Sequence, residues 1–154
     1  QAFAFDHVFH PDATQHEVYA RCALPLVDAV LEARNACIFA FGATGAGKTF
    51  SMLGPEGGRR RGAQDGILPR VAAELFRRIA HLEEGARQAL GSGGFSAYEV
   101  RCSFLEVYRE SAFDLLAGPV SASRDPASAC ALREDRDGRV YAEGAREEVV
   151  RSLE

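Results

Sequence analysis

A glycine-rich segment that ends in a lysine constrains the fold of this chain more than any other feature. Residues 42–49 read GATGAGKT and fit the pattern G-x-x-x-x-G-K-[ST]. In this pattern successive backbone N–H groups surround phosphate oxygens, and glycines remove the Cβ atoms that would block the approach. A strand precedes such a loop, and a helix follows with its positive end directed at the phosphates. Residues 36–41 are apolar and residues 50–53 are helix-like, which predicts an α/β fold with a central β-sheet flanked by helices on both faces.

The same pattern predicts the residues of a nucleotide site. We expect the Lys48 ammonium to bridge the β and γ phosphates, which makes it the candidate catalytic residue, and the Thr49 hydroxyl to hold Mg²⁺. Lys48 is the only lysine among 18 basic residues, and a lysine ammonium is a compact charge that fits a tight anion site. The predicted phosphate-binding residues are Gly42, Ala43, Thr44, Gly45, Ala46, Gly47, Lys48 and Thr49.

Composition excludes several other classes of protein. The chain has 154 residues, of which 47% are hydrophobic and 26% charged, and this balance is typical of a folded domain rather than a disordered segment. The longest apolar run, residues 36–43, is far shorter than the ~20 residues of a membrane helix. A net charge of −4 disfavours a general nucleic-acid binder. The spacing of the four cysteines fits no zinc pattern, which favours reduced thiols.

Hydrophobic periodicity predicts further elements on both sides of the loop. Thr14 and Glu17 have the spacing of a capping box at the start of a helix. The patterns predict a strand over residues 2–9, a helix over 14–34 with Pro25 as a possible kink, a helix over 67–82, a strand over 97–108, a hairpin over 131–143 that turns at Asp137 and Gly138, and a helix over 146–154.

Several segments in the same order resemble the kinesin motor domain family. They cover nearly the whole chain, and together they are far more specific than the glycine-rich loop alone. Residues 3–9 are similar to the family's F-x-F-D-x-V-F, 14–19 to T-Q-x-x-V-Y, 38–42 to I-F-A-Y-G, 66–70 to G-I-I-P-R, and 103–116 to S-F-L-E-I-Y-N-E followed by D-L-L.

The resemblance implies an ATP-dependent microtubule motor of the cytoplasm and cytoskeleton, with ATP and Mg²⁺ as ligands and tubulin as partner. It implies that residues 1–154 are part of a kinesin motor domain. The family's first strand would then lie before Gln1, and its switch motifs, S-S-R-S-H and D-L-A-G-S-E, after Glu154. We therefore expect this chain by itself to hydrolyse ATP poorly or not at all.

Some residues differ from the family pattern. Phe50 stands where the family often has His or Tyr against the adenine, so the resemblance adds Phe50 to the candidate nucleotide site. Ala43 replaces a Gln, and Arg34 replaces a Tyr, where it either stacks on the nucleotide or is a solvated helix end. The arginines at 59–61 are interpreted as a solvated charge run and residues 121–124 as a linker.

Two other functions are compatible with the loop. One is a nucleotide- or microtubule-binding module without hydrolysis, which is a truncated or degenerate motor. The other is a different P-loop enzyme, such as a small-molecule kinase, which needs an acidic residue at the end of an apolar strand. Glu106 and Asp114 are the candidates for that acidic residue.

Overall fold

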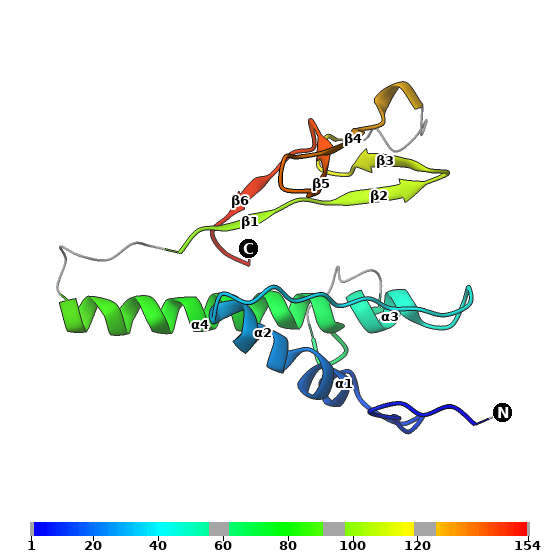
Figure 1. Ribbon diagram of the computed structural model, residues 1–154. Helices are drawn as coiled ribbons and strands as arrows, with labels where there is room; N and C mark the ends of the chain where they lie inside the picture. Colours follow the sequence, from blue (N-terminus) through cyan, green and yellow to red (C-terminus); the bar gives the residue numbers. More distant parts are fainter. Residues whose placement is uncertain (1, 56–61, 91–97, 119–125, 154) are drawn as a thin grey trace. The chain divides into compact units, whose positions relative to one another are not determined.

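The computed structural model describes residues 2–55, 62–90, 98–118 and 126–153 (Figure 1). The arginines at 59–61 and the linker at 121–124 lie outside these ranges. The chain forms two compact units, essentially residues 1–96 and 97–152. Each unit is described by itself below.

Within the described residues, the first unit contains four α-helices: α1 (Gln15–Cys22), α2 (Leu24–Leu31), α3 (Lys48–Leu53) and α4 (Ile67–Leu90). The predicted capping box starts α1. The N–H of Thr14 donates to Glu17 Oε2 at 2.7 Å, and the N–H of Glu17 donates to Thr14 Oγ1 at 3.2 Å. The first of these bonds lowers the pKa of the Glu17 carboxyl below its ordinary value. The cap therefore satisfies two N–H groups that a helix start otherwise leaves unpaired.

The helix predicted over residues 14–34 is two helices that meet at Ala23. Pro25 occupies the first turn of α2, where its missing N–H costs nothing. Inside a continuous helix the same proline would remove a hydrogen bond and clash with the preceding turn. The chain therefore ends α1 and starts α2, which is a sharper change than a kink.

A small apolar core holds the helices together. Tyr19, Ala23 and Ile67 are buried, with Val18, Leu24, Ile38, Met52 and Val71 packed around them. Both α1 and α2 contact α4, as Figure 1 shows. The helix α4 continues to Leu90, eight residues past the predicted end. No helix in the described ranges is long and apolar enough to span a membrane.

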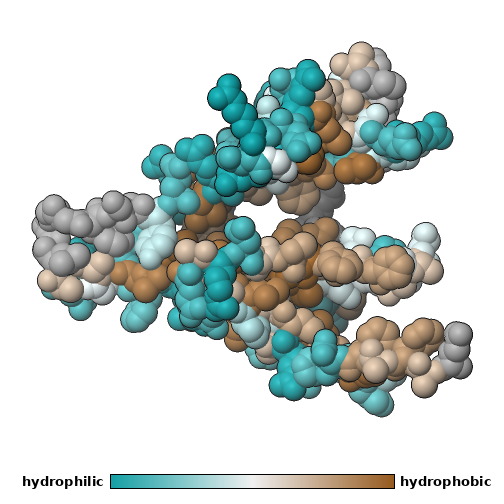
Figure 2. Space-filling view, in the orientation of Figure 1, coloured by the Kyte–Doolittle hydropathy of each residue, from teal (hydrophilic) through white to brown (hydrophobic). Residues whose placement is uncertain are grey.

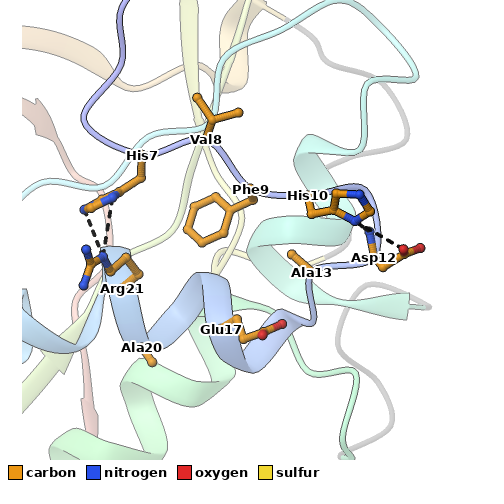
Figure 3. Close-up of a pocket in the computed structure, with 9 residues that line it drawn as sticks. All are labelled: His7, Val8, Phe9, His10, Asp12, Ala13, Glu17, Ala20 and Arg21. Carbon is orange, nitrogen blue, oxygen red and sulfur yellow. Dashed lines mark hydrogen bonds and ion pairs between the residues drawn. The ribbon is translucent and has the colours of Figure 1, made fainter.

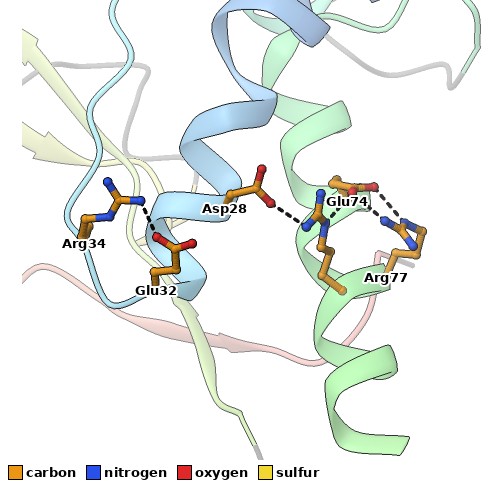
Figure 4. Close-up of polar contacts among 6 residues, drawn as sticks. Asp28, Glu32, Arg34, Glu74 and Arg77 are labelled. Atoms are coloured by element: carbon orange, nitrogen blue, oxygen red, sulfur yellow. Dashed lines mark hydrogen bonds and ion pairs between the residues drawn. The ribbon is translucent and has the colours of Figure 1, made fainter. Parts of the chain in front are cut away.

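An ion-pair cluster joins α2 to α4 beside this core (Figure 4). Glu74 accepts hydrogen bonds from Arg77 and Arg78 at 2.7 Å, and Arg78 Nη1 lies 2.5 Å from Asp28 Oδ1 on α2. The hydrogen bonds from Arg77 and Arg78 lower the pKa of Glu74 to about 2. Figure 4 also shows Arg34 paired with Glu32. Arg34 is exposed there and lies three residues past the end of α2.

The two strands predicted in the first unit do not form. Residues 2–9 and 36–41 have no strand assignment, and Phe3, Phe5, Phe39 and Phe41 are 76%, 73%, 81% and 93% exposed. Figure 2 shows the N-terminal segment with hydrophobic surface in brown. A strand needs a neighbour for its N–H and C=O groups, and no described strand pairs with either segment. The expected central sheet is consequently absent from the described part of the chain.

Three antiparallel strand pairs form the second unit. β1 (Val100–Cys102) pairs with β6 (Glu148–Val150), β2 (Leu105–Tyr108) with β3 (Ser111–Asp114), and β4 (Ala131–Glu134) with β5 (Val140–Glu143). The predicted hairpin over 131–143 is confirmed. Asp135 Oδ1 accepts the N–H groups of Asp137 and Arg139, and Gly138 takes a φ of 78° in the turn. A short 3₁₀ helix, η4 (Pro126–Ser128), precedes β4.

Two predictions for the second unit are wrong. The single strand expected over 97–108 is interrupted at residues 103–104, so that β1 and β2 have different partners. The helix expected over 146–154 is the strand β6 instead. Val150 lies opposite Val100 and Glu148 opposite Cys102, so pairing with β1 overrides the helical pattern of this segment.

Candidate functional site

The glycine-rich loop leads into α3 as the sequence predicted. Gly45 and Gly47 have φ angles of 83° and 88°, in the left-handed region that residues with a Cβ atom rarely adopt. Gly47 is the N-cap residue of α3, and Lys48 is its first helical residue. No atom lies within 4 Å of where a Cβ atom at Gly45 or Gly47 would be. Backbone conformation, rather than lack of space, therefore requires glycine at both positions.

Lys48 folds back over the loop that precedes it. Its Nζ atom donates to the carbonyl oxygens of Gly42 at 2.9 Å and Ala43 at 2.8 Å. The N–H of Ala46 donates to the Ala43 carbonyl at 3.2 Å, which closes the turn. These contacts hold a cation beside the loop backbone, at the start of a helix. A phosphate group would find a positive charge and backbone N–H donors together there.

Thr49 and Phe50 follow Lys48 on the first turn of α3, and both side chains are exposed. Phe50 is 48% exposed. The Thr49 hydroxyl is an oxygen donor of the kind that Mg²⁺ prefers. The structure thus places all nine predicted residues, 42–50, on one loop and one helix turn.

Two residues that the sequence offered only as positions of family motifs, Gln15 and Gly66, contact α3. The Gln15 side chain donates to the Phe50 carbonyl at 2.7 Å. The backbone of Gly66 lies against the last turn of α3, and a Cβ atom there would lie 2.5 Å from the Met52 carbonyl carbon. Neither contact has a signal in the sequence, because each joins residues far apart along the chain.

An open pocket of about 750 Å³ lies between the N-terminal segment and α1 (Figure 3). Arg21 Nε donates to His7 Nε2 at 3.0 Å, and His10 Nδ1 lies 3.2 Å from Asp12 Oδ2. None of residues 42–50 lines this pocket. Its full lining is His7, Val8, Phe9, His10, Asp12, Ala13, Glu17, Ala20 and Arg21. The predicted site is therefore a surface loop rather than this pocket.

Asp114 is one of the two candidates for the acidic residue that another P-loop enzyme would need at the end of an apolar strand. In this structure it has a structural role in the second unit. Its side chain is buried, with Oδ1 accepting the N–H of Leu116 at 2.8 Å and Oδ2 accepting the N–H of Arg146 at 3.0 Å. Both carboxylate oxygens are thus engaged by backbone amides of their own unit. Glu106 lies within β2, opposite Phe113, rather than at the end of a strand. These contacts disfavour the interpretation of the chain as another P-loop enzyme.

The described residues also contain no group of three or more potential metal ligands among His, Cys, Asp and Glu. The four cysteines are free.

Comparison with known proteins decides the family. A family model described as the kinesin motor domain matches residues 1–154. The chain belongs to the kinesin motor domain family. It is 39% identical to Kinesin-like protein KIN-12B of Arabidopsis thaliana, 39% identical to Kinesin-like protein 5 of Schizosaccharomyces pombe, and 38% identical to Kinesin-like protein KIF15 of Homo sapiens. Each match covers 99% of this chain but only 11%, 15% and 10% of those relatives, respectively.

The same family appears among solved structures. A fast kinesin, studied for its ATPase mechanism and interactions with microtubules, superposes with a TM-score of 0.74 at 30% sequence identity. The match covers 97% of this chain and 37% of that structure. The likeness confirms the predicted fold class, the P-loop NTPase fold of a kinesin motor domain, although the described strands of this chain form antiparallel pairs.

Proposed function

We propose that residues 42–50 bind ATP together with Mg²⁺, and that residues 1–154 are part of the motor domain of a microtubule motor. The observation that carries the proposal is the position of the Lys48 ammonium, 2.8 and 2.9 Å from two carbonyl oxygens of the glycine-rich loop. Membership of the kinesin family supports the same assignment.

Each residue of the loop has a defined task in this proposal. The backbone N–H groups between Gly42 and Lys48 donate to phosphate oxygens, and Gly45 and Gly47 allow the turn that directs them. Lys48 exchanges its two carbonyl partners for the β and γ phosphates. Thr49 provides a hydroxyl ligand for Mg²⁺, and the Phe50 ring stacks on the base. When bound, Mg²⁺ supplies positive charge that offsets the negative phosphates.

We propose that the whole protein couples hydrolysis of ATP to movement along microtubules, as a cytoskeletal protein of the cytoplasm. Hydrolysis also needs groups that position the attacking water and respond to the γ phosphate. The motifs S-S-R-S-H and D-L-A-G-S-E, which hold these groups in the family, do not occur within residues 1–154. We therefore expect the chain alone to bind ATP with little turnover.

Titration with a fluorescent ATP analogue, with and without Mg²⁺, tests the binding site. The variant Lys48→Ala removes a charged hydrogen-bond donor and should weaken binding about 10- to 100-fold. Arg136→Ala is the matched control, since it removes one exposed positive charge from the second unit. Absence of binding by the unmodified chain, or equal affinity in Lys48→Ala, would contradict the proposal.

A nucleotide- or microtubule-binding module without hydrolysis is the second candidate. Phosphate release distinguishes it from a motor. A longer chain that includes the motor sequence expected after residue 154 should release phosphate faster in the presence of microtubules. Release that stays at the background level would favour the module.

A further inference from the structure

The side chain of Gln15 is a buried polar group that joins two helices of the first unit. It is 8% exposed, and its Nε2 atom donates to the Phe50 carbonyl oxygen at 2.7 Å. That carbonyl also accepts the N–H of Gly54 at 2.8 Å, so it receives two donors. Thirty-five residues separate Gln15 from Phe50 in the sequence.

The capping box directs Gln15 toward α3. Gln15 is the first residue of α1, directly after the N-cap residue Thr14. Thr14 and Glu17 exchange hydrogen bonds that fix the first turn of α1. Burial also favours the bond from Gln15 to Phe50. A buried side-chain amide that lost its partner would lose a hydrogen bond that water could not replace.

The helix α3 depends on such outside contacts. It has six residues, far fewer than the ~12–15 at which an isolated helix becomes even marginally stable in water. The loop before it is closed by its own bonds, from Lys48 to Gly42 and Ala43 and from Ala46 to Ala43. The Gln15 bond reaches α3 at Phe50, two residues after Lys48. Loss of this bond would loosen Phe50 more than the loop.

We propose that Gln15 is a positioning residue of the nucleotide site, which holds Phe50 where its ring stacks on the base of the bound nucleotide. This inference rests on the proposed function of residues 42–50. Gln15 contacts α3 through the carbonyl oxygen of Phe50, and it acts on the base rather than on the phosphates.

Comparison of two ligands distinguishes the contribution of the base to binding from that of the phosphates. ATP has both parts, whereas inorganic tripolyphosphate has no base. The variants Gln15→Met and Gln15→Leu present no N–H to the carbonyl and introduce no charge. Each should weaken ATP binding about three- to tenfold, the cost of one lost hydrogen bond, and should change tripolyphosphate affinity less than twofold. Binding is measured by calorimetry on the full chain, and circular dichroism reports the folded state.

Gln88→Met is the matched control. Gln88 donates to Glu84 on the exposed side of α4 at 2.7 Å, so its loss removes a similar bond far from Phe50 in the sequence. We expect both affinities to stay unchanged in this variant.

Three results would overturn the inference: equally weakened binding of both ligands, unchanged ATP affinity, or unfolding of both Gln15 variants. Gln15 would then have only a structural role or no role in binding. Failure of the proposed function gives a different result, in which the unmodified chain binds neither ATP nor tripolyphosphate.

Discussion

The backbone of Gly66 packs directly against the backbone of Gly54 where α3 ends. A Cβ atom at Gly66 would lie 2.7 Å from the Gly54 amide nitrogen and 2.6 Å from that of Leu53. Real Cβ atoms do not approach backbone so closely, and these neighbours have no flexible end that can move aside. The contact therefore sets how closely the chain before α4 approaches α3, the helix that follows the glycine-rich loop.

Replacement of Gly66 by alanine should destabilise the first unit. Forcing a methyl group into this contact should lower the free energy of unfolding by about 1–3 kcal/mol. Gly85→Ala is the matched control, because Gly85 lies within α4 and no atom lies within 4 Å of its Cβ position. That variant should raise the free energy by about 0.5–1 kcal/mol. Denaturant unfolding measures both, and equal stability of the two variants would contradict the packing argument.

The turn between β2 and β3 predicts a stabilising substitution. Arg109 and Glu110 have φ angles of 46° and 66°, a conformation typical of glycine or asparagine in two-residue hairpins. The Arg109 guanidinium carbon lies 5.2 Å from the centre of the Tyr108 ring, so substitution of Arg109 would also remove a cation–π contact.

We therefore choose Glu110→Gly, which should raise the melting temperature and the free energy of unfolding by about 0.5–1 kcal/mol. Gly138→Ala tests the reverse case, because Gly138 has a φ of 78° and its Cβ position has only an ordinary contact, 3.7 Å from Glu134. It should destabilise the β4–β5 hairpin. Loss of stability in Glu110→Gly would show that backbone strain at this turn is unimportant.

Acid should weaken the ion pairs that Glu74 makes with Arg77 and Arg78 within α4. Hydrogen bonds from Arg77 and Arg78 lower the pKa of Glu74 to about 2, against an ordinary value of 4.5. A carboxyl whose pKa is lowered by folding stabilises the protein above its unfolded pKa, and this stability is lost as the pH falls through the folded pKa. The window is therefore from about pH 4.5 down to about pH 2.

Glu74→Gln should cost about 1 kcal/mol at pH 6, since water screens the exposed Arg77, and the difference from the unmodified chain should shrink toward pH 2. Urea unfolding at several pH values measures the difference. The matched control is Glu84→Gln, which removes an exposed carboxylate on the same helix. A constant difference between pH 6 and pH 2 for Glu74→Gln would refute the assigned role of the ion pairs.

Phe50 offers a direct optical test of base stacking. The chain contains no tryptophan, so Phe50→Trp introduces a single indole at the proposed base contact. We expect ATP to quench its fluorescence, whereas inorganic tripolyphosphate should change it little. Phe41→Trp, at a ring that is 93% exposed, is the control for non-specific effects. Equal responses to ATP and tripolyphosphate would place the base elsewhere.

The sequence alone determined the features that depend on neighbours along the chain. The capping box of Thr14 and Glu17 and the hairpin turn at Asp137 and Gly138 form where their patterns predict them. The helix expected after the glycine-rich loop also forms, although it starts at Lys48, two residues before the predicted segment 50–53. Residues 42–50 are contiguous, so the candidate site could be found in the same way. In each case the hydrogen bonds or backbone angles involved belong to residues only a few positions apart.

Only the tertiary structure decided what depends on distant partners. Residues 148–150 have a helical pattern but pair with β1, and the apolar residues 36–41 have a strand pattern but no paired strand in the described structure. The bond from Gln15 to Phe50 and the contact of Gly66 with α3 likewise join segments that folding brings together. A strand or a buried amide is stable only when its hydrogen-bonding partner is present, and no local pattern names that partner.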